Sequence, residues 1–218
     1  MPGVEPERRP TQRESRQGQH RGPEQGSAAT RDLWIFGYGS LMWRPEFAFV
    51  EQVRGRIHGF HRALCIYSHH WRGTPERPGL VLGLDRGGSC VGSCFRIAAE
   101  AAATTLEQVR ARELVTSVYE EIAAPVRLAD GRRQVALAYV ARRDHHQFAG
   151  TLPLTEVVRI VRGGTGAGGS NMDYVQSTVR HLGEMGLRDA VLEAVAAGCA
   201  PAVAPLIAPP ARPERTAP

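Results

Sequence analysis

The strongest constraint on the fold of this chain is the order of its hydrophobic patterns, which are mostly strand-like in the first two thirds of the central region and helical in the last third. Short or alternating apolar runs predict strands at 33–36, 53–60, 63–67, 80–84, 91–97, 122–128 and 134–141. Helical spacing predicts helices at 105–115, 155–161, 171–182 and 187–197. Strands that follow one another directly favour antiparallel pairing, so we expect an α+β fold with a mostly antiparallel sheet.

Glycines add detail to that sheet. Gly83 and Gly92 fall inside strand patterns, where glycine often marks a bulge or a sharp bend at a barrel corner. Asp130-Gly131 separates the last two predicted strands and is a typical signal for a type I′ hairpin. We therefore expect a curved sheet that can close into a barrel.

The two ends of the chain differ in composition from its centre. Residues 1–31 are rich in Arg, Glu, Gln, Gly and Pro, and they cannot bury enough apolar surface to offset the entropy of ordering. Residues 200–218 consist largely of Ala and Pro. We expect disordered tails at 1–31 and 200–218 around one domain at 32–199.

Charge and cysteine content narrow the classes of function. Of the net charge of +5, residues 1–30 carry +1 (five Arg, four Glu) and residues 208–218 another +1 (two Arg, one Glu), which leaves +3 for the body. This mild charge disfavours a nucleic-acid partner, because such surfaces show a localised basic stripe with interleaved aromatic side chains. The start lacks an apolar signal segment, and no apolar run reaches the roughly 18 residues of a membrane span. With four cysteines that lack the spacing of a disulfide framework, we expect a cytoplasmic protein with reduced thiols and no membrane partner.

The helix predicted at 105–115 carries an acidic residue on its apolar side. Thr104 and Glu107 match a capping box, which marks where the helix begins. With Val109 placed at 0° and a turn of about 100° per residue, Glu113 lies at about 40°, inside the apolar stripe. Burial there raises the pKa of a carboxyl group and makes it a useful acid or base near neutral pH. The alternative is a buried structural glutamate paired with an arginine.

The first predicted strand runs into a turn, Gly37-Tyr38-Gly39-Ser40. Glycines on both sides of the tyrosine let backbone N–H groups approach a ligand, and successive N–H groups in such a turn form a concave site for an anion. A tight turn around a packed tyrosine explains the pattern equally well. Ser40 is disfavoured as a nucleophile because its neighbours do not form G-x-S-x-G.

Two further patterns are interpreted as carrying no chemistry. Gly164 to Gly169 satisfies G-x-G-x-x-G and leads into a helix capped by Ser170, but no return strand follows to complete a dinucleotide-binding unit. We interpret these glycines as a flexible loop bordering the site. Candidate metal ligands occur only as isolated pairs, namely Cys90 and Cys94, His69 and His70, and His145 and His146. We therefore expect neither a metal nor a cofactor.

Several segments together resemble the ChaC family of γ-glutamylcyclotransferases. They are FGYGSLMW (36–43), WRGTPERPGLVLGL (71–84), GGSCVG (87–92), RELVTSVYEE (112–121) and GSNMDYV (169–175). They occur in the family's order and span Trp34 to about Gly198. The resemblance implies the γ-glutamylcyclotransferase-like fold, a small mixed β-barrel flanked by helices. It also implies an enzyme that cleaves glutathione to 5-oxoproline and Cys-Gly.

The resemblance assigns roles to individual residues. It makes Glu113 the catalytic acid/base and Arg72 a weaker candidate for a substrate contact. The implied substrate-binding residues are Ile35, Phe36, Gly37, Tyr38, Gly39, Ser40, Leu41 and Tyr174. No cofactor is implied, because the substrate's own α-amine attacks its γ-carbonyl and the nucleophile is already tethered.

Two alternative functions stay open at this stage. The same reaction could act on γ-glutamyl amino acids or γ-glutamylamines, which share the reacting group and differ only in the leaving group. A basic nucleic-acid-binding module is the alternative from another class, and the charge distribution disfavours it. The sequence does not reveal the oligomeric state.

Overall fold

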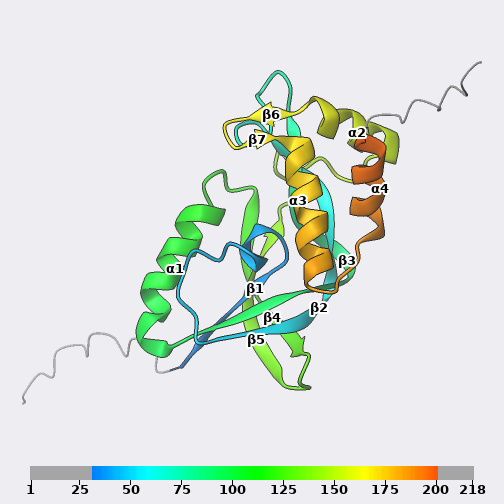
Figure 1. Cartoon of the computed structure of the whole chain (residues 1–218). Helices are drawn as coiled ribbons and strands as arrows, with labels where there is room; N and C mark the ends of the chain where they lie inside the picture. Colours follow the sequence, from blue (N-terminus) through cyan, green and yellow to red (C-terminus); the bar gives the residue numbers. More distant parts are fainter. Residues whose placement is uncertain (1–30, 201–218) are drawn as a thin grey trace, which may run out of the picture.

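A closed β-barrel forms the centre of the molecule (Figure 1). The computed structural model describes residues 31–200, so the predicted tails lie outside the described residues except at their inner ends. The barrel strands are β1 (Leu33–Gly37), β2 (Glu51–Ser68), β3 (Gly79–Ile97), β4 (Tyr119–Leu128) and β5 (Arg133–Ala141). Their order is β1-β3-β2-β4-β5, and the barrel closes through parallel pairing of β5 with β1 and β3. The remaining pairs are antiparallel, which confirms the predicted α+β class and the mostly antiparallel sheet.

The two longest strands correct the predicted boundaries. The runs at 53–60 and 63–67 are both parts of β2, and the runs at 80–84 and 91–97 are both parts of β3. Register shifts interrupt the β2–β3 ladder at two points without ending either strand. At one of them Gly59 has a φ of 83°, a conformation that glycine adopts without steric cost. The shift lies opposite Gly87 and Gly88, the glycines between the predicted runs at 80–84 and 91–97, so β3 continues through a bulge where two separate strands were predicted.

The predicted hairpin between β4 and β5 is present, but its turn is of another type. Gly131 has a positive φ of 92°, whereas Asp130 does not, so the turn is not type I′. The Gly131 N–H donates to the Leu128 carbonyl (3.0 Å), and the Leu128 N–H donates to the Arg132 carbonyl (2.8 Å). This is the pattern of a three-residue loop that ends in a glycine bulge.

All four predicted helices exist, with shifted ends. They are α1 (Ala99–Glu113), α2 (Leu154–Gly163), α3 (Asn171–Glu184) and α4 (Ala190–Cys199). The predicted capping box is wrong, because Thr104 lies inside α1 and the N-cap is Ala98, which makes no side-chain cap bond. The alanines at 101–103 favour helix strongly and carry α1 further toward its N-terminus than the capping pattern implied.

The helices cover opposite sides of the barrel (Figure 1). Val109 of α1 packs into a cluster with Ile35, Phe95 and Tyr139. Helices α2, α3 and α4 gather on the other side and extend the main barrel core with their own buried side chains, which are Val157, Ile160, Val161, Val175, Leu182, Leu192 and Val195. Glu113, at the end of α1, and Tyr174, in the first turn of α3, thus come from helices on opposite sides of the barrel.

The G-x-G-x-x-G segment forms a small hairpin, β6 (Thr165–Gly166) with β7 (Gly169–Ser170). Only α4 follows α3 among the described residues, so the predicted absence of a βαβ unit is confirmed there. The Ala167 and Gly168 N–H groups donate to the carbonyls of His70 and Trp71. The hairpin is therefore attached to the β2–β3 loop, whereas the sequence predicted a flexible loop. Ser170 caps α3 through the Asp173 N–H, as predicted.

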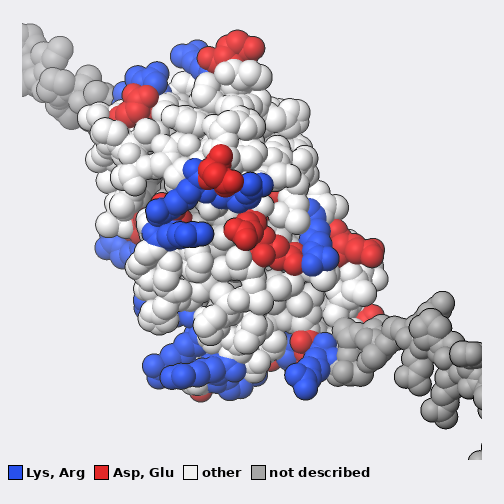
Figure 2. All heavy atoms as spheres, turned by 180° about the vertical axis from the view of Figure 1, so that it is seen from behind, with Lys and Arg blue, Asp and Glu red and all other residues white. Residues whose placement is uncertain are grey.

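The surface carries no continuous basic stripe on the face that Figure 2 shows. Basic and acidic side chains lie side by side across its middle, and further basic side chains gather at its lower end. Within the described range, no helix is long and apolar enough to cross a membrane.

Close strand contacts generate a stability prediction. A Cβ atom on Gly92 would lie 2.2 Å from the Gly37 carbonyl oxygen, so β1 can approach β3 only because this position lacks a side chain. We expect Gly92→Ala to lower the free energy of unfolding by about 1–3 kcal/mol or more, measured by urea titration. Gly183→Ala, a change in α3 with no atom within 4 Å of the added Cβ, is the control and should be neutral or stabilising by up to about 1 kcal/mol. Equal stability of the Gly92→Ala variant and the wild type would contradict this account.

Candidate active site

The candidate substrate turn begins where β1 ends. A Cβ on Gly37 would lie 3.0 Å from the Leu41 Cβ, so the glycine lets the chain fold back closely on itself. One 3-10 turn, η1 (Ser40–Met42), follows, and the Met42 N–H donates to the Gly39 carbonyl (2.9 Å). The predicted substrate-binding residues Ile35, Phe36, Gly37, Tyr38, Gly39 and Leu41 are buried, and Ser40 is partly exposed.

Three successive backbone N–H groups of this turn are free to bind a ligand. Those of Gly39, Ser40 and Leu41 have no acceptor among the residues that the structure describes. Consecutive N–H groups of this kind make a concavity with a positive potential that suits an anion. The geometry therefore fits the predicted anion-binding turn better than a turn that only packs a tyrosine.

Glu113 is the last residue of α1, and its side chain is only 17% exposed. Burial raises the pKa of its carboxyl group, and Arg112, whose Nε lies 3.3 Å from Oε1, lowers that pKa by a smaller amount. A helix C-terminus also disfavours a negative charge, because the last carbonyls of the helix carry partial negative charge. The inward direction predicted from the helical phase agrees with this burial.

The charge of Glu113 acts on the hydroxyls of several tyrosines, among them Tyr38, Tyr119 and Tyr174. Burial raises the pKa of Tyr38 and Tyr119 well above the ordinary value and that of Tyr174 to about 12, and the Glu113 charge adds to each shift. The Tyr119 hydroxyl donates to the Leu82 carbonyl (2.7 Å), and the Leu82 N–H donates to the Tyr174 hydroxyl (3.2 Å). The Tyr174 hydroxyl accepts this bond, so its own proton stays available for a ligand.

Tyr119 is a site residue that the sequence reasoning missed. It is the first residue of β4, whereas the predicted strand began at 122. Its partner on β3 is distant in the sequence, so no local spacing could have paired them. The one available signal was its place inside the RELVTSVYEE segment of the family resemblance.

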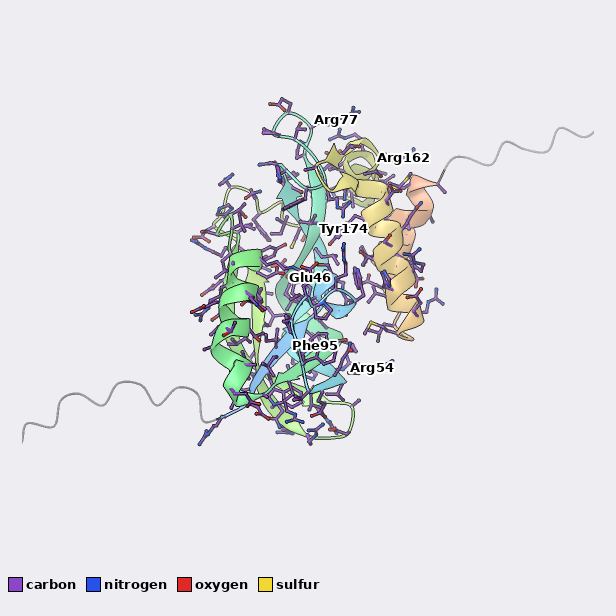
Figure 3. The ribbon with its side chains drawn as sticks, turned by 60° about the vertical axis from the view of Figure 1, so that its left-hand side comes forward. Glu46, Arg54, Arg77, Phe95, Arg162 and Tyr174 are labelled. Carbon is purple, nitrogen blue, oxygen red and sulfur yellow. The ribbon has the colours of Figure 1, made fainter. Side chains whose placement is uncertain are left out.

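Arg112 joins the turn to the helix that carries Glu113. Its Nη2 donates to the Ser40 hydroxyl (2.9 Å), and its Nη1 donates to the Arg44 carbonyl (2.7 Å) and lies 3.1 Å from the Glu46 carboxylate. Figure 3 shows Glu46 and Tyr174 between α1 and α3, in the region that the turn crosses. Because the Ser40 hydroxyl is engaged with a guanidinium and no base faces it, a nucleophilic role for Ser40 stays disfavoured.

Arg72 supports Tyr174 from behind. Its guanidinium lies 5.2 Å from the centre of the Tyr174 ring, and it donates to the carbonyls of Gly168 and Ser170. Cation–π contacts of this kind hold an aromatic ring in place. The contacts of Arg72 are thus with the protein, and they do not favour the predicted contact with a substrate.

Three of the histidines predicted to be unsuitable for metal binding lie close together, with the ring centroid of His146 4.3 Å from that of His145 and 6.3 Å from that of His69. No group of three or more His, Cys, Asp or Glu side chains within the described range is arranged to hold a metal ion. All four cysteines are buried and unpaired, and burial raises the pKa of the Cys90 and Cys94 thiols. Neutral buried thiols of this kind are unreactive.

An open hollow of about 530 Å³ lies next to the candidate site, and Tyr119 is part of its lining. Its lining consists of Leu114, Ser117, Tyr119, Glu120, Glu121, Arg142 and Asp144. Three carboxylates against one arginine do not favour an anionic ligand there. The turn and Glu113, which are not part of that lining, are therefore the better candidate for binding an anionic substrate.

Comparisons with known proteins agree with this arrangement. The family described as ChaC-like protein matches residues 33–199. The glutathione-specific γ-glutamylcyclotransferase of Escherichia coli K12 is 32% identical over 157 residues, which cover 72% of this chain and 68% of that protein. The corresponding enzyme of Schizosaccharomyces pombe is 31% identical over 69% of this chain and 84% of its own length.

A solved structure supports the fold independently. The crystal structure of a yeast γ-glutamyl cyclotransferase specific to glutathione superposes with a TM-score of 0.70. It covers 77% of this chain and 95% of the yeast chain at 21% identity, a likeness that speaks for the fold alone. The predicted small mixed barrel flanked by helices is confirmed. With its family match over most of its length and its bacterial relative at 32% identity, the chain belongs to the ChaC-like family.

Proposed function

We propose that this chain is a glutathione-specific γ-glutamylcyclotransferase, a lyase that releases 5-oxoproline and Cys-Gly. The observation that carries the proposal is a mostly buried carboxylate with a raised pKa, at Glu113, across from a turn with three free N–H groups. Both lie in a chain of the ChaC-like family, and the relatives named above are called glutathione-specific.

In the proposed reaction the α-amine of the γ-glutamyl group attacks the γ-carbonyl carbon. A new C–N bond closes the five-membered ring, and the bond from the γ-carbonyl carbon to the cysteine nitrogen breaks. Glu113 accepts a proton from the α-ammonium and donates it to the leaving nitrogen, and the second proton that the ring nitrogen must lose then passes through the regenerated carboxylate to the freed amine or to water. Because the nucleophile is tethered to the electrophile, effective molarities on the order of 10⁵ M or more are available, and the mechanism needs no metal or cofactor.

The raised pKa of Glu113 serves this proton transfer. Moving a proton from an α-ammonium with a pKa of about 8 to a carboxylate with a pKa of about 4.3 costs roughly 5 kcal/mol. Each unit by which burial raises the pKa of the carboxyl group removes about 1.4 kcal/mol of that cost. Burial of Glu113 therefore favours its use as a base.

The turn at residues 35–41 is proposed to bind the negative charges of the substrate. Its free N–H groups suit either the α-carboxylate or the oxyanion that develops on the γ-carbonyl. Tyr174, whose hydroxyl proton is not used by the protein, is proposed as a further donor. We also propose a cytoplasmic location, because the four buried thiols are unpaired and thus suited to a reducing compartment.

The first test replaces the proposed acid/base. We expect Glu113→Gln to lower kcat for 5-oxoproline release from glutathione by about 10²–10⁴-fold or more, because the amide keeps the shape but cannot transfer the proton. The folded-state pKa of Glu113 is raised, so the ionised side chain costs stability at pH values above its unfolded pKa. At neutral pH the variant should therefore unfold at the same or a higher urea concentration than the wild type.

Glu107→Gln, an exposed change on the same helix, is the matched control and should keep full activity. A Glu113→Gln protein that unfolds earlier and turns over glutathione normally would identify Glu113 as a structural ion-pair partner and overturn the mechanism.

The pH dependence of kcat/KM is the second test. A general base must be ionised, so the rate falls as pH drops through the pKa of Glu113, and we expect the midpoint of this acid limb above 4.5. Arg112 favours the ionised carboxylate, and Arg112→Gln should therefore move the midpoint to a higher pH. Arg110 is another arginine of α1, and its ion-pair partner is Glu121 of β4. Arg110→Gln should leave the midpoint of the acid limb unchanged. An unchanged or lower midpoint in Arg112→Gln would contradict the assignment.

Substrate choice is the third test. We expect a higher kcat/KM for glutathione than for γ-glutamyl-alanine, because Cys-Gly offers a thiol, a second peptide and a distal carboxylate whose binding energy can align the amine with the carbonyl. The shorter substrate should show a lower kcat as well as a higher KM. Initial rates of 5-oxoproline release from purified protein would measure both. Equal or reversed values would place the chain with enzymes of γ-glutamyl amino acids.

A further inference from the structure

Arg62 is a buried charge next to the candidate turn that no sequence pattern indicated. It lies on β2, and its side chain is only 7% exposed. Its Nε donates to the Tyr38 carbonyl (2.6 Å), its Nη2 donates to the Val91 carbonyl (2.8 Å), and its Nη1 lies 3.4 Å from the Asp189 carboxylate. One guanidinium thus joins the turn, β3 and the start of α4.

The bond to Tyr38 determines the direction of the first free N–H group. The Tyr38 carbonyl and the Gly39 N–H belong to the same peptide bond, and the described residues contain no cis peptide bond. In a trans peptide the C=O and N–H groups point in opposite directions. Because Arg62 holds the carbonyl, the Gly39 N–H must point away from Arg62 and α4.

Asp189 connects this contact to α4. Its Oδ1 accepts the Leu192 N–H (3.2 Å) and caps the helix, while its Oδ2 faces Arg62. On the opposite side, Arg112 of α1 holds the Ser40 hydroxyl. Two arginines from different elements, Arg62 of β2 and Arg112 of α1, thus hold the turn at the Tyr38 carbonyl and at Ser40.

The contacts of Arg62 suit orientation of the turn. Guanidinium bonds to carbonyls are charge-assisted and therefore stronger than neutral ones. Removing the guanidinium would leave the Tyr38 and Val91 carbonyls and the Asp189 carboxylate without this partner in a largely buried place. The Tyr38–Gly39 peptide would then lose the contact that fixes its orientation.

We propose that Arg62 is a positioning residue for anion binding by the turn at residues 37–41. By holding the Tyr38 carbonyl, it keeps the Gly39 N–H directed at the anionic group of the bound γ-glutamyl substrate. Asp189 keeps the guanidinium in place. This inference rests on the proposed cyclotransferase function.

The test compares Arg62→Met and Arg62→Lys with the wild type. Binding of 5-oxoproline, measured by calorimetry, reports on the γ-glutamyl half of the site, because this product retains the α-carboxylate and the ring carbonyl and lacks the leaving group. We expect Arg62→Met to weaken 5-oxoproline binding and to lower kcat/KM for glutathione, each by about 10- to 100-fold, as for a lost hydrogen bond to a charged group. Arg62→Lys keeps the positive charge but loses the several N–H donors of the guanidinium. Its 5-oxoproline affinity and kcat/KM should therefore lie between those of the wild type and Arg62→Met.

Two further variants separate positioning from general stability. Arg96→Met removes an arginine that pairs with Asp32 and Glu51, and it should leave 5-oxoproline affinity unchanged even if it lowers the unfolding midpoint. Asp189→Asn keeps a good helix cap and removes the charge that faces Arg62, so it should weaken 5-oxoproline binding less than Arg62→Met does.

Arg62→Met with wild-type 5-oxoproline affinity and wild-type kcat/KM would overturn the inference. If that variant does not fold, Arg62→Lys decides in its place, and wild-type affinity in it would overturn the inference equally. A wild-type protein that releases no 5-oxoproline would overturn the proposed function and this inference together. An active wild type with unaffected Arg62 variants would overturn only the role of Arg62.

Discussion

The pairing of β2 with β3 is the interaction on which the rest of the structure depends. The two strands pair from Ser68 with Gly79 at one end to Glu51 with Arg96 at the other, and β3 also pairs with β1 and β5. Much of the candidate site is attached to this pair: the turn continues from β1, which pairs with β3, and two tyrosines from β4 and α3 bind the backbone of Leu82 in β3. A long ladder with bulges can curve enough to close a small barrel, which a flat hairpin could not.

Two arginines hold the turn of the candidate site in its conformation. Arg112 reaches the turn from α1 through Ser40, and Arg62 reaches it from β2 through the Tyr38 carbonyl. Between these anchors the N–H groups of the turn stay free, although buried backbone donors are normally paired. Polar groups left unpaired in an otherwise satisfied fold are a typical property of ligand sites.

The sequence predicted the classes of element and the direction of Glu113 better than it predicted boundaries. The angle between Val109 and Glu113 around the helix depends only on the helical repeat. The predicted inward direction of Glu113 therefore agrees with its burial, although the capping box used to place the helix start was wrong. The break predicted between 84 and 91 was wrong, because Gly87 and Gly88 lie in a bulge of one continuous strand. Tyr119 and Arg62 were missed because their roles come from contacts with residues far away in the sequence, such as Leu82 and Asp189.

A comparison within the protein favours the proposed role of Glu113 over that of a structural ion-pair partner. Glu121 is equally exposed, at 17%, but Arg110 gives it two hydrogen bonds of 2.8 and 2.6 Å, and the pKa of its carboxyl group is lowered. Burial raises the pKa of Glu113, and Arg112, which lies 3.3 Å away and directs its hydrogen bonds to the turn, offsets only part of that rise. A pair selected for stability would compensate the buried carboxylate fully. The incomplete compensation at Glu113 instead keeps a carboxylate that gains a proton readily, which is the property that the proposed transfer from amine to leaving group needs.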